Sequence, residues 1–448
     1  MARLRLPHSL TLLVLCILVA AVLTHVLPAG EFQRHEDLAT GRTVVVAGTY
    51  ARVESRPVGP FEALMAIPKG ITDAASVIGL IFLVGGAFGV VERAGTLGRL
   101  VRWMVGKLAR RRALVIPVAS VVFALGGIVE HMQEELIAFV PALLLLSRSL
   151  GYTPLTIVAM SLGSAAVGAA FGPVDPFSVL IAQRLSQLPP GSALGFRMLF
   201  LLPGLAIWIW GTARYAARTR IEPSLTADDA GSAVLDARDI VIVLSIIAAF
   251  AVYVYGAQHL DWEFDQLSAL LFTVGVIAGL LGRLGMDGTA EAFADGFKSM
   301  GYAALLVGFA RGIYVVMSEG RIVDTIVNGL FAPIHGLSPA LSGIGMMLAH
   351  TVIHFPVPSV SGQAVLTMPL LVPLSDLIGL SRQVAVLAYQ YGAGLCEVLA
   401  PTNGALMAML AASGVGYEEW LRFALPLWAL LACLGAVAVA VGVAVGLR

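Results

Sequence analysis

A short acidic run lies inside an apolar stretch of the chain. The segment GGIVEHMQEE supplies five candidate binding residues: Glu130, His131, Gln133, Glu134 and Glu135. If the chain is helical from Glu130 onward, Glu130 and Glu134 share one face. Two carboxylates on one apolar face cannot both ionise cheaply, so we expect a proton, a cation or an ammonium group between them. The alternative is an ordinary turn at a membrane surface.

A second polar run has a different chemistry. The segment PVPSVSGQ offers hydroxyls and an amide where the first run has carboxylates, with the candidates Ser359, Ser361, Gly362 and Gln363. If the two runs meet, they form an asymmetric site that is acidic from one side and neutral from the other.

Two proline-interrupted segments add backbone groups. The first reads FGPVDP and supplies Phe171, Gly172, Pro173 and Asp175. The second reads LAPTNG and supplies Leu399, Ala400, Pro401, Thr402 and Asn403. Proline disrupts the helical ladder, so the carbonyls before each break are expected to be free and to suit a small hard cation such as sodium. The N-terminus of each following half-helix favours an anion, and a plain proline kink is the alternative.

Further polar residues lie deep in apolar segments. Arg311 is expected either to bind a substrate carboxylate or to neutralise one of the glutamates. Glu397 precedes the second break by four residues and is a candidate cation ligand or proton carrier. His350 and His354 have the spacing of a zinc pair, but no HExxH glutamate lies between them. We therefore interpret them as packing residues and expect neither a transition metal nor a cofactor.

The composition indicates where these residues lie. Of the 448 residues, 58% are hydrophobic and 12% are charged, and the formal net charge is +0. So much apolar surface cannot be hidden in a water-soluble core. A soluble enzyme, a disordered scaffold and a nucleic-acid-binding protein are therefore excluded. Cys16, Cys396 and Cys433 all fall in apolar stretches, so neither a disulfide framework nor a CxxC metal site is predicted.

We predict an all-α polytopic membrane protein. Nine segments are long enough to cross a bilayer: 9–27, 77–92, 154–186, 194–213, 239–256, 265–283, 301–318, 383–412 and 421–446. The stretches 114–149 and 338–379 are interrupted at their centres. Their halves of about 16 residues reach only about 24 Å, so they are predicted to be re-entrant hairpins. The first span is taken as retained, and cleavage as a signal peptide is the alternative.

Basic residues orient the predicted spans. Residues 93–112 and 214–238 are rich in arginine and are expected in the cytoplasm, together with the N-terminus. Residues 29–73 are polar, mixed in charge and rich in glycine and proline, so they are predicted to form a long external loop. The expected location is the bacterial inner membrane.

The second half of the chain repeats the first at an offset of 228 residues. The matching positions are Pro141, Gly151 and Pro173 with Pro369, Gly379 and Pro401. One additional span, 265–283, reverses the second unit in the membrane. We therefore divide the chain into a first half, 1–213, a cytoplasmic linker, 214–238, and a second half, 239–448. Inverted repeats of this kind support alternating access around a site at the bilayer midplane.

A secondary transporter explains the repeat, the helix breaks and the acidic run together. An intramembrane enzyme would need a fuller ligand set. A primary pump would need a nucleotide motif, and no GxxxxGK[ST] occurs in the chain. A channel would not need two mirror-related hairpins. A channel and an enzyme therefore remain only as alternatives from other classes.

Several segments also resemble one family. VLPAGEF, GGIVEHMQEE, GPVDPF, FARGI, PVPSVSGQA and APTNGA look like the YfcC-type carriers of the C4-dicarboxylate anaerobic carrier (DcuC-like) group, within the larger ion-transporter superfamily. The resemblance implies a scaffold domain, a mobile elevator-type transport domain, a homodimer, and sodium or proton coupling. Asp175 stands where the family pattern has asparagine, which adds a titratable carboxylate at the first break.

Together these features predict a cation-coupled carrier of a small carboxylate-bearing metabolite, either a C4-dicarboxylate or an amino acid. Cations, protons or an ammonium group would be bound by Glu130, Glu134, Glu135 and Asp175. The substrate would accept and donate hydrogen bonds at Ser359, Ser361, Gln363, Thr402 and Asn403. A basic amino acid antiporter or exchanger is the alternative. The expected partners are the substrate, the lipid bilayer and a second copy of the chain.

Overall fold

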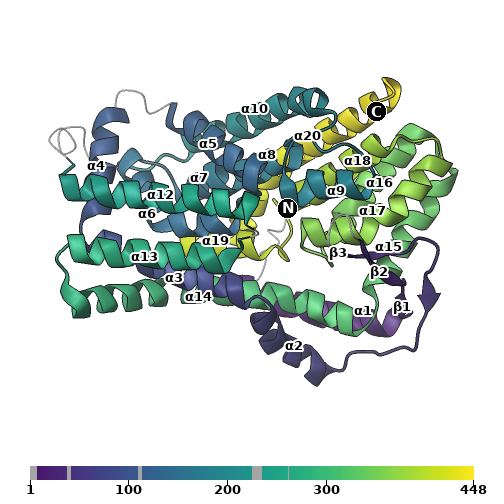
Figure 1. The fold of residues 1–448 in the computed structure, drawn as a ribbon, viewed down its shortest axis with the longest axis horizontal. Helices are drawn as coiled ribbons and strands as arrows, with labels where there is room; N and C mark the ends of the chain where they lie inside the picture. Colours follow the sequence, from purple (N-terminus) through teal and green to yellow (C-terminus); the bar gives the residue numbers. More distant parts are fainter. Residues whose placement is uncertain (1–7, 38–41, 109–113, 224–234, 261, 448) are drawn as a thin grey trace.

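The structure of the chain is a computed structural model that describes residues 8–37, 42–108, 114–223, 235–260 and 262–447 (Figure 1). Eight helical segments in this part of the chain are long and apolar enough to cross a membrane: Ser9–Val26, Ala75–Arg93, Pro154–Leu185, Leu194–Arg218, Phe264–Leu281, Gly285–Glu319, Val360–Leu377 and Tyr417–Ala444. Large apolar side chains such as Val22, Leu202 and Leu280 are exposed on these segments, as a lipid-facing surface requires. The chain is therefore a helical, multi-pass membrane protein.

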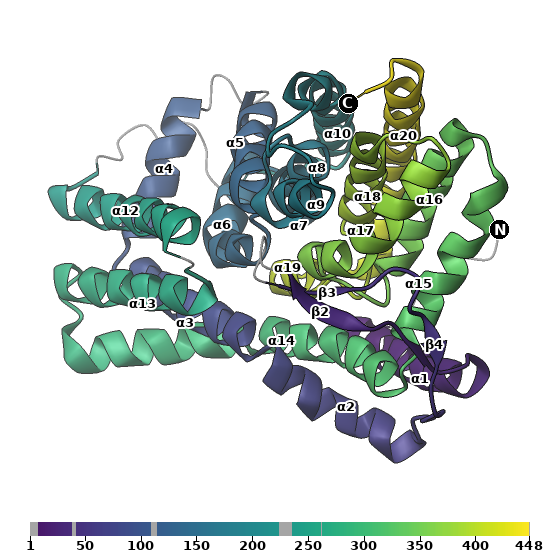
Figure 2. The same ribbon diagram turned by 45° about the vertical axis from the view of Figure 1, so that its right-hand side comes forward.

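The long helix α14 (Gly285–Glu319) organises one part of the molecule. Helices α1 (Ser9–Val26), α2 (Pro60–Asp73), α3 (Ala75–Arg93) and α13 (Phe264–Leu281) pack along it, and α12 (Ala237–His259) and α4 (Thr96–Leu108) lie beside them (Figure 2). A Cβ added to Gly70 would lie only 2.4 Å from the carbonyl oxygen of Gly308. Small residues at such crossings let apolar helices approach closely in lipid, where burial of apolar surface gives little driving force.

A second part of the molecule carries both proline-interrupted segments. Its first stretch contains α5 (Val115–Glu130), η2 (Glu134–Phe139), α6 (Val140–Leu150), α7 (Pro154–Val158), η3 (Ala159–Gly163), α8 (Ser164–Phe171), η4 (Pro176–Leu180), α9 (Ile181–Leu185) and α10 (Leu194–Arg218). Its second stretch contains α15 (Val323–Phe331), η5 (Ala332–Gly336), α16 (Pro339–Ile353), α17 (Val360–Leu377), α18 (Arg382–Cys396), α19 (Gly404–Ser413) and α20 (Tyr417–Ala444). The two stretches lie side by side in Figure 2.

Equivalent positions of the two stretches have the same local geometry. α6 and α17 are followed by the left-handed glycines Gly151, with φ 79°, and Gly379, with φ 70°. In each case the amide of the next residue bonds back to a serine carbonyl, from Tyr152 to Ser147 and from Leu380 to Ser375. Glycine is the residue that adopts this conformation without strain, which explains its presence at both helix ends.

Corresponding helices of the two stretches also pack through a glycine, although these two glycines are 224 and not 228 positions apart. A Cβ on Gly168 of α8 would lie 2.3 Å from the Ala124 carbonyl oxygen of α5. A Cβ on Gly392 of α18 would lie 2.3 Å from the Met347 carbonyl oxygen of α16. The helix before each break therefore packs with its backbone close to a neighbouring helix, α8 against α5 and α18 against α16.

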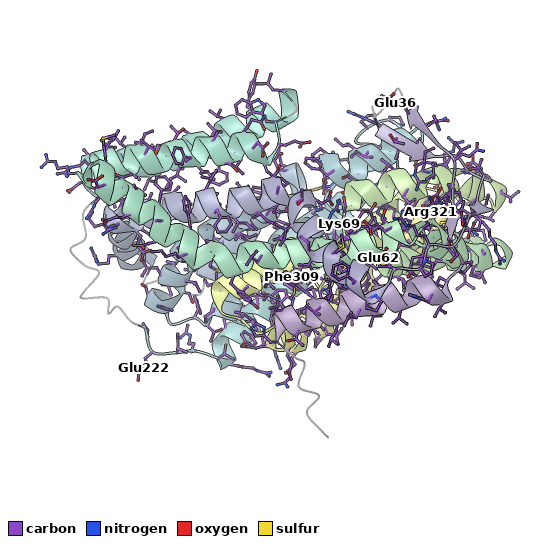
Figure 3. All side chains as sticks on the ribbon, turned by 90° about the horizontal axis from the view of Figure 1, so that it is seen from below. Glu36, Glu62, Lys69, Glu222, Phe309 and Arg321 are labelled. Atoms are coloured by element: carbon purple, nitrogen blue, oxygen red, sulfur yellow. The ribbon has the colours of Figure 1, made fainter. Side chains whose placement is uncertain are left out.

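The prediction of one long loop over residues 29–73 is wrong. Strand β1 (Gly30–Glu31) pairs antiparallel with β4 (Ala51–Arg52), and β2 (Arg34–Asp37) pairs antiparallel with β3 (Arg42–Val45). The β2–β3 pair, hereafter the ribbon, packs against α17. Residues 60–73 form α2, which begins with a proline and is capped by the Glu62 carboxylate on the Gly59 amide at 2.8 Å. In Figure 3, Glu36 of the ribbon and Glu222 lie toward opposite sides of the molecule.

Other segment boundaries also differ from the prediction. α14 begins at Gly285 and not at residue 301, because an acidic first part continues directly into the apolar span. The basic segment 93–112 contains helix α4. The segment 383–412 is divided into α18 and α19, as the proline predicts. Arg110, Arg111 and Arg112, and most of the linker (224–234), lie outside the described residues.

Candidate functional site

The acidic run forms the connection between α5 and α6. α5 ends at Glu130, and His131 adopts the left-handed conformation with φ 54°, so the chain turns at this residue. The imidazole then reaches two other segments. Nδ1 lies 2.6 Å from Asp175 Oδ2, and Nε2 lies 3.2 Å from Glu397 Oε1. His131 therefore joins the first connection to both proline breaks.

Asp175 has two roles at the first break. It is fully buried, and its Oδ1 accepts the backbone amides of Phe177 and Ser178 at 2.9 and 3.2 Å. At the second break, Asn403 Oδ1 accepts the amide of Leu406 at 3.2 Å. Asp175 and Asn403 are 228 positions apart in the sequence. Each thus caps the half-helix that follows its break, and the remaining side-chain atoms point to the residues of the first connection.

Gln133 links the α5–α6 connection to the second break. Its Nε2 donates to Glu397 Oε2 at 2.6 Å, and its Oε1 accepts from Asn403 Nδ2 at 3.1 Å. Asn403 Nδ2 also donates to the Glu397 backbone carbonyl at 3.2 Å. All three side chains are buried, so the fixed hydrogen bonds replace water at this position. We call His131, Gln133, Asp175, Glu397 and Asn403 the polar network.

The connection between α16 and α17 reaches the same network. Gln363 is fully buried, and its Oε1 lies 3.0 Å from His354 Nδ1. Its Nε2 donates to the His350 carbonyl at 2.9 Å. On the other side, His354 Nε2 lies 4.0 Å from Glu397 Oε1. Glu397 thus lies between the first polar run, which it contacts through His131 and Gln133, and His354, which contacts Gln363 of the second run.

The three glutamates of the first run do not share a helix face. Because α5 stops at Glu130 and η2 begins at Glu134, the expected helical pairing of these two residues is wrong. Glu135 is buried and accepts the Gln133 amide at 3.1 Å and the Tyr253 hydroxyl of α12 at 3.4 Å. The Glu135 carboxylate thus contacts both the backbone of Gln133, a member of the polar network, and helix α12.

The neutral candidates serve in part as structural caps. Ser359 Oγ accepts the Gly362 amide at 3.1 Å and begins α17. Ser361 is half-buried in the first turn of α17. Thr402 differs, because its hydroxyl is buried and has no hydrogen-bond partner among the described residues. A buried hydroxyl without a partner is costly, so a ligand that bonds it would relieve this cost.

The expected free carbonyls at the breaks are largely occupied. The Gly172 carbonyl accepts Gln390 Nε2 at 2.6 Å, the Leu399 carbonyl accepts the Tyr417 hydroxyl at 2.5 Å, and the Ala400 carbonyl accepts the Asn403 amide at 3.0 Å. For these three positions the prediction of carbonyls left free by the proline is wrong. Side chains of neighbouring helices supply the donors to Gly172 and Leu399, and the local Asn403 amide supplies the donor to Ala400.

Arg311 lies away from the polar network. Its guanidinium pairs with Asp73 of α2 and stacks on the Tyr314 ring at 4.8 Å from the centroid. The alternative in which Arg311 neutralises a glutamate of the first run is therefore wrong. A second arginine, Arg197 of α10, was not predicted from the sequence. It is fully buried and donates to Gln390 Oε1 at 2.5 Å and to Gln383 Oε1 at 3.0 Å. A basic residue inside the predicted span 194–213 was the available signal.

His350 of α16 and His354, which directly follows α16, both contact the Gln363 side chain but differ in their other neighbours. His350 packs against the rings of Phe331 and Tyr389, with centroids 5.5 and 5.3 Å away, which agrees with its interpretation as a packing residue. His354 contacts Gln363 and approaches Glu397, so it belongs to the polar surroundings of the site. In the part of the chain that the structure describes, no three histidine, cysteine or acidic side chains are grouped as metal ligands.

Comparison with known proteins places this geometry in a family. The model of the C4-dicarboxylate anaerobic carrier family, DcuC, matches residues 6–444. The chain belongs to the DcuC family. This DcuC-family carrier is 32% identical over 403 residues to the putative basic amino acid antiporter YfcC of Escherichia coli K12, which covers 85% of this chain and 79% of the relative. It is 28% identical over 418 residues to an uncharacterised protein of Haemophilus influenzae, which covers 90% and 82%.

Two solved structures are similar to the DcuC-family carrier over nearly its whole length. One is MtrF of Neisseria gonorrhoeae, described with a class of antimetabolite efflux pumps, with a TM-score of 0.45, 19% identity and coverage of 98% and 95%. The other is the YdaH transporter of Alcanivorax borkumensis, with a TM-score of 0.43, 16% identity and coverage of 98% and 99%. The family match makes this chain a membrane transporter of small molecules and not an enzyme.

Proposed function

We propose that this protein is a cation-coupled secondary carrier of small carboxylate-bearing metabolites, and that its polar network binds the charged groups. The observation that carries the proposal is that four separate segments meet around His131 and Glu397, with Asp175 of the first break against His131 and the other segments against Glu397. The four segments are the α5–α6 connection, the first break, the second break and the α16–α17 connection. Irregular backbone deep in a membrane protein is tolerated where it lines a binding cavity or is buried in protein.

The charge of the network favours a cationic group in the bound state. Asp175, Glu397 and Glu135 are buried. Among the described residues His131 hydrogen-bonds Asp175 and Glu397, and His354 lies 4.0 Å from Glu397, so three carboxylates face two imidazoles. Each uncompensated charge costs about 2.5–3.5 kcal/mol at bilayer depth on insertion scales. A proton, a sodium ion or a substrate ammonium group would remove this cost. Among the two expected substrate classes, an amino acid therefore suits the network better than a dicarboxylate.

Two further features favour coupling through carboxylates over coupling through backbone carbonyls. The carbonyls of Gly172, Leu399 and Ala400 already accept hydrogen bonds from the protein. Asp175 contributes a carboxylate to the first break, directly against His131. Proton coupling, or exchange of one cationic amino acid for another, follows from this arrangement. Exchange of one cationic amino acid for another agrees with the name of the Escherichia coli relative, a putative basic amino acid antiporter.

We further infer that the two halves are inverted repeats with re-entrant hairpins. The shared caps at Gly151 and Gly379 and the shared helix contacts at Gly168 and Gly392 support this inference. The helices around α14 would form the scaffold, and the two hairpins with their broken helices would move as an elevator. A homodimer in the bacterial inner membrane, with a cytoplasmic N-terminus, completes the proposal.

Uptake into proteoliposomes tests the function. Purified carrier is supplied with radiolabelled succinate, L-aspartate or L-lysine under imposed sodium or proton gradients, and in a second series with unlabelled amino acid inside. We expect uptake of at least one amino acid to follow the proton gradient or the internal amino acid. Uptake that is indifferent to every gradient contradicts coupling. Glu134→Gln should abolish uptake in a folded protein, and unchanged uptake would remove Glu134 from the site.

A further inference from the structure

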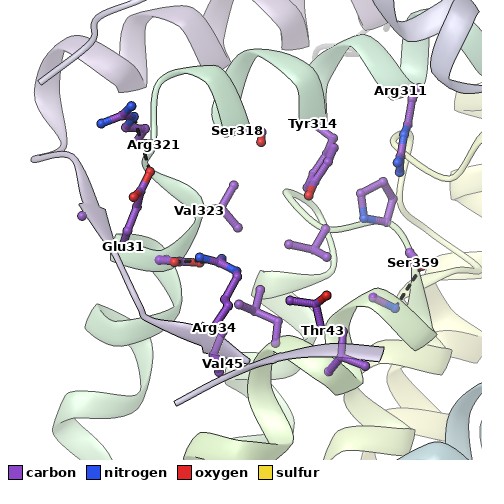
Figure 4. A pocket seen from close by; sticks show the side chains of 17 residues that line it. Glu31, Arg34, Thr43, Val45, Arg311, Tyr314, Ser318, Arg321, Val323 and Ser359 are labelled. Carbon is purple, nitrogen blue, oxygen red and sulfur yellow. Dashed lines mark hydrogen bonds and ion pairs between the residues drawn. The ribbon is translucent and has the colours of Figure 1, made fainter. Parts of the chain in front are cut away.

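A separate cavity lies beneath the ribbon. It has a volume of about 440 Å³ and is bounded by the ribbon, the end of α14, the start of α15 and the α16–α17 connection (Figure 4). We call it the ribbon cavity. Its polar side chains include three arginines and several hydroxyls, among them Arg34, Thr43, Arg311, Tyr314, Arg321 and Ser359. The volume is within the range of sites for small metabolites.

One of the three arginines in the ribbon cavity has no carboxylate partner among the other residues that line the cavity. Arg34 pairs with Asp324, with Nη2 at 2.9 Å from both carboxylate oxygens, and Arg321 lies 3.4 Å from Glu31. All four of these residues line the cavity. Arg311 also lines it, but its partner Asp73 does not. The lining thus has three guanidinium groups and two carboxylates, and its excess charge is positive.

The pair that Arg311 forms with Asp73 is easily exchanged. The Arg311 side chain is 34% exposed and that of Asp73 is 46% exposed. An ion pair with this much water around it contributes little net stability. A ligand carboxylate inside the cavity can therefore replace Asp73 at low cost. Arginine suits this role because its planar group binds a carboxylate through two parallel hydrogen bonds.

We propose that the ribbon cavity is a second binding site that takes the carboxylate of the transported metabolite at Arg311, before the metabolite reaches the polar network. Ser359 and Gly362 line the cavity, and the next residue, Gln363, contacts His354 beside Glu397. The start of α17 thus borders a positive cavity on one side and an acidic network on the other. This inference rests on the proposed carrier function and adds a loading site with the opposite charge preference.

Thiol labelling in the cavity tests the proposal apart from transport. Thr43 lines the cavity, and no hydrogen bond of its hydroxyl is described. Thr43→Cys is introduced into the full-length carrier together with Cys16→Ser and Cys433→Ser, and the purified protein is treated with a maleimide in detergent. We expect millimolar L-lysine, L-aspartate or succinate to slow the labelling. Cadaverine, which is lysine without its carboxylate, should give no protection.

Two substitutions identify the group that holds the carboxylate. Arg311→Gln should raise the half-protecting concentration about tenfold or more, because a charge-assisted hydrogen bond is lost. Asp73→Asn should lower it, because Arg311 loses its competing partner. Arg93→Gln, which alters an exposed arginine paired with Glu291, is the matched control and should change nothing.

Three results would overturn the inference. These are labelling that no carboxylate slows, equal protection by cadaverine, and Asp73→Asn weakening protection as Arg311→Gln does. If gradient-driven uptake persists in any of these cases, the ribbon cavity fails as a loading site while the carrier function stands. If protection is seen but uptake ignores every gradient, the coupled-carrier proposal fails instead.

Discussion

Replacing Glu397 by glutamine tests the polar network at its centre. The Glu397 carboxylate faces His131 Nε2 at 3.2 Å and accepts from Gln133 Nε2 at 2.6 Å. A carboxamide has a single acceptor oxygen, so Glu397→Gln leaves one of these partners facing an N–H group. The loss of one charge-assisted hydrogen bond costs about 1.5–3 kcal/mol. We therefore expect a fall of about 10–100-fold in kcat/KM for uptake.

The assay is initial uptake into proteoliposomes with and without an imposed proton gradient. For Glu397→Gln we expect the residual uptake to lose its dependence on the gradient, and the melting temperature to fall because a buried partner loses its acceptor. Glu419→Gln is the matched control, since Glu419 is exposed and accepts the Tyr215 hydroxyl at 3.2 Å. Wild-type kcat/KM with unchanged gradient dependence in Glu397→Gln would refute the reasoning.

Three further substitutions have clear expectations. Thr402→Val removes a buried hydroxyl that has no hydrogen-bond partner among the described residues. If a ligand bonds this hydroxyl, KM for uptake rises about tenfold. An unchanged KM with a higher melting temperature would show that no ligand bonds it. Gly392→Val places a side chain against the Met347 carbonyl oxygen, 2.3 Å from the Cβ position. It should lower the free energy of unfolding by about 1–3 kcal/mol and so lower the melting temperature. Gly79→Ala, which has open space at its Cβ position, should leave the melting temperature unchanged. Asp324→Asn weakens the bonds to Arg34 and to the Phe32 amide, so it should speed hydrogen exchange in strands β1 and β2. Unchanged exchange would show that Asp324 does not hold these strands.

The sequence predicted the features that depend on composition and spacing. Hydropathy located the apolar spans, and proline located both helix breaks. The offset of 228 residues predicted which positions correspond, and Asp175 and Asn403 indeed cap equivalent half-helices. These features follow from local chemistry, because a missing backbone donor or a left-handed glycine acts on its own segment.

Features that depend on contacts between distant segments could not be predicted in the same way. The pairing of Glu397 with both Gln133 and His131 is fixed by how four segments pack. Arg311 lies in α14 within the predicted span 301–318, but its partner Asp73 is on a helix that the polar composition of residues 29–73 concealed. The left-handed turn at His131 breaks the helical spacing on which the expected glutamate pair depended.

The central claim is that the α5–α6 connection and the second helix break form one buried site. It is tested most directly by cross-linking Gln133→Cys to Asn403→Cys with a short bifunctional thiol reagent, in the Cys16→Ser, Cys433→Ser carrier in lipid. The Gln133 and Asn403 side chains are 3.1 Å apart, so we expect efficient cross-linking that stops uptake and that transported amino acids slow. A yield no higher than that of Gln133→Cys with Ser245→Cys would contradict the account.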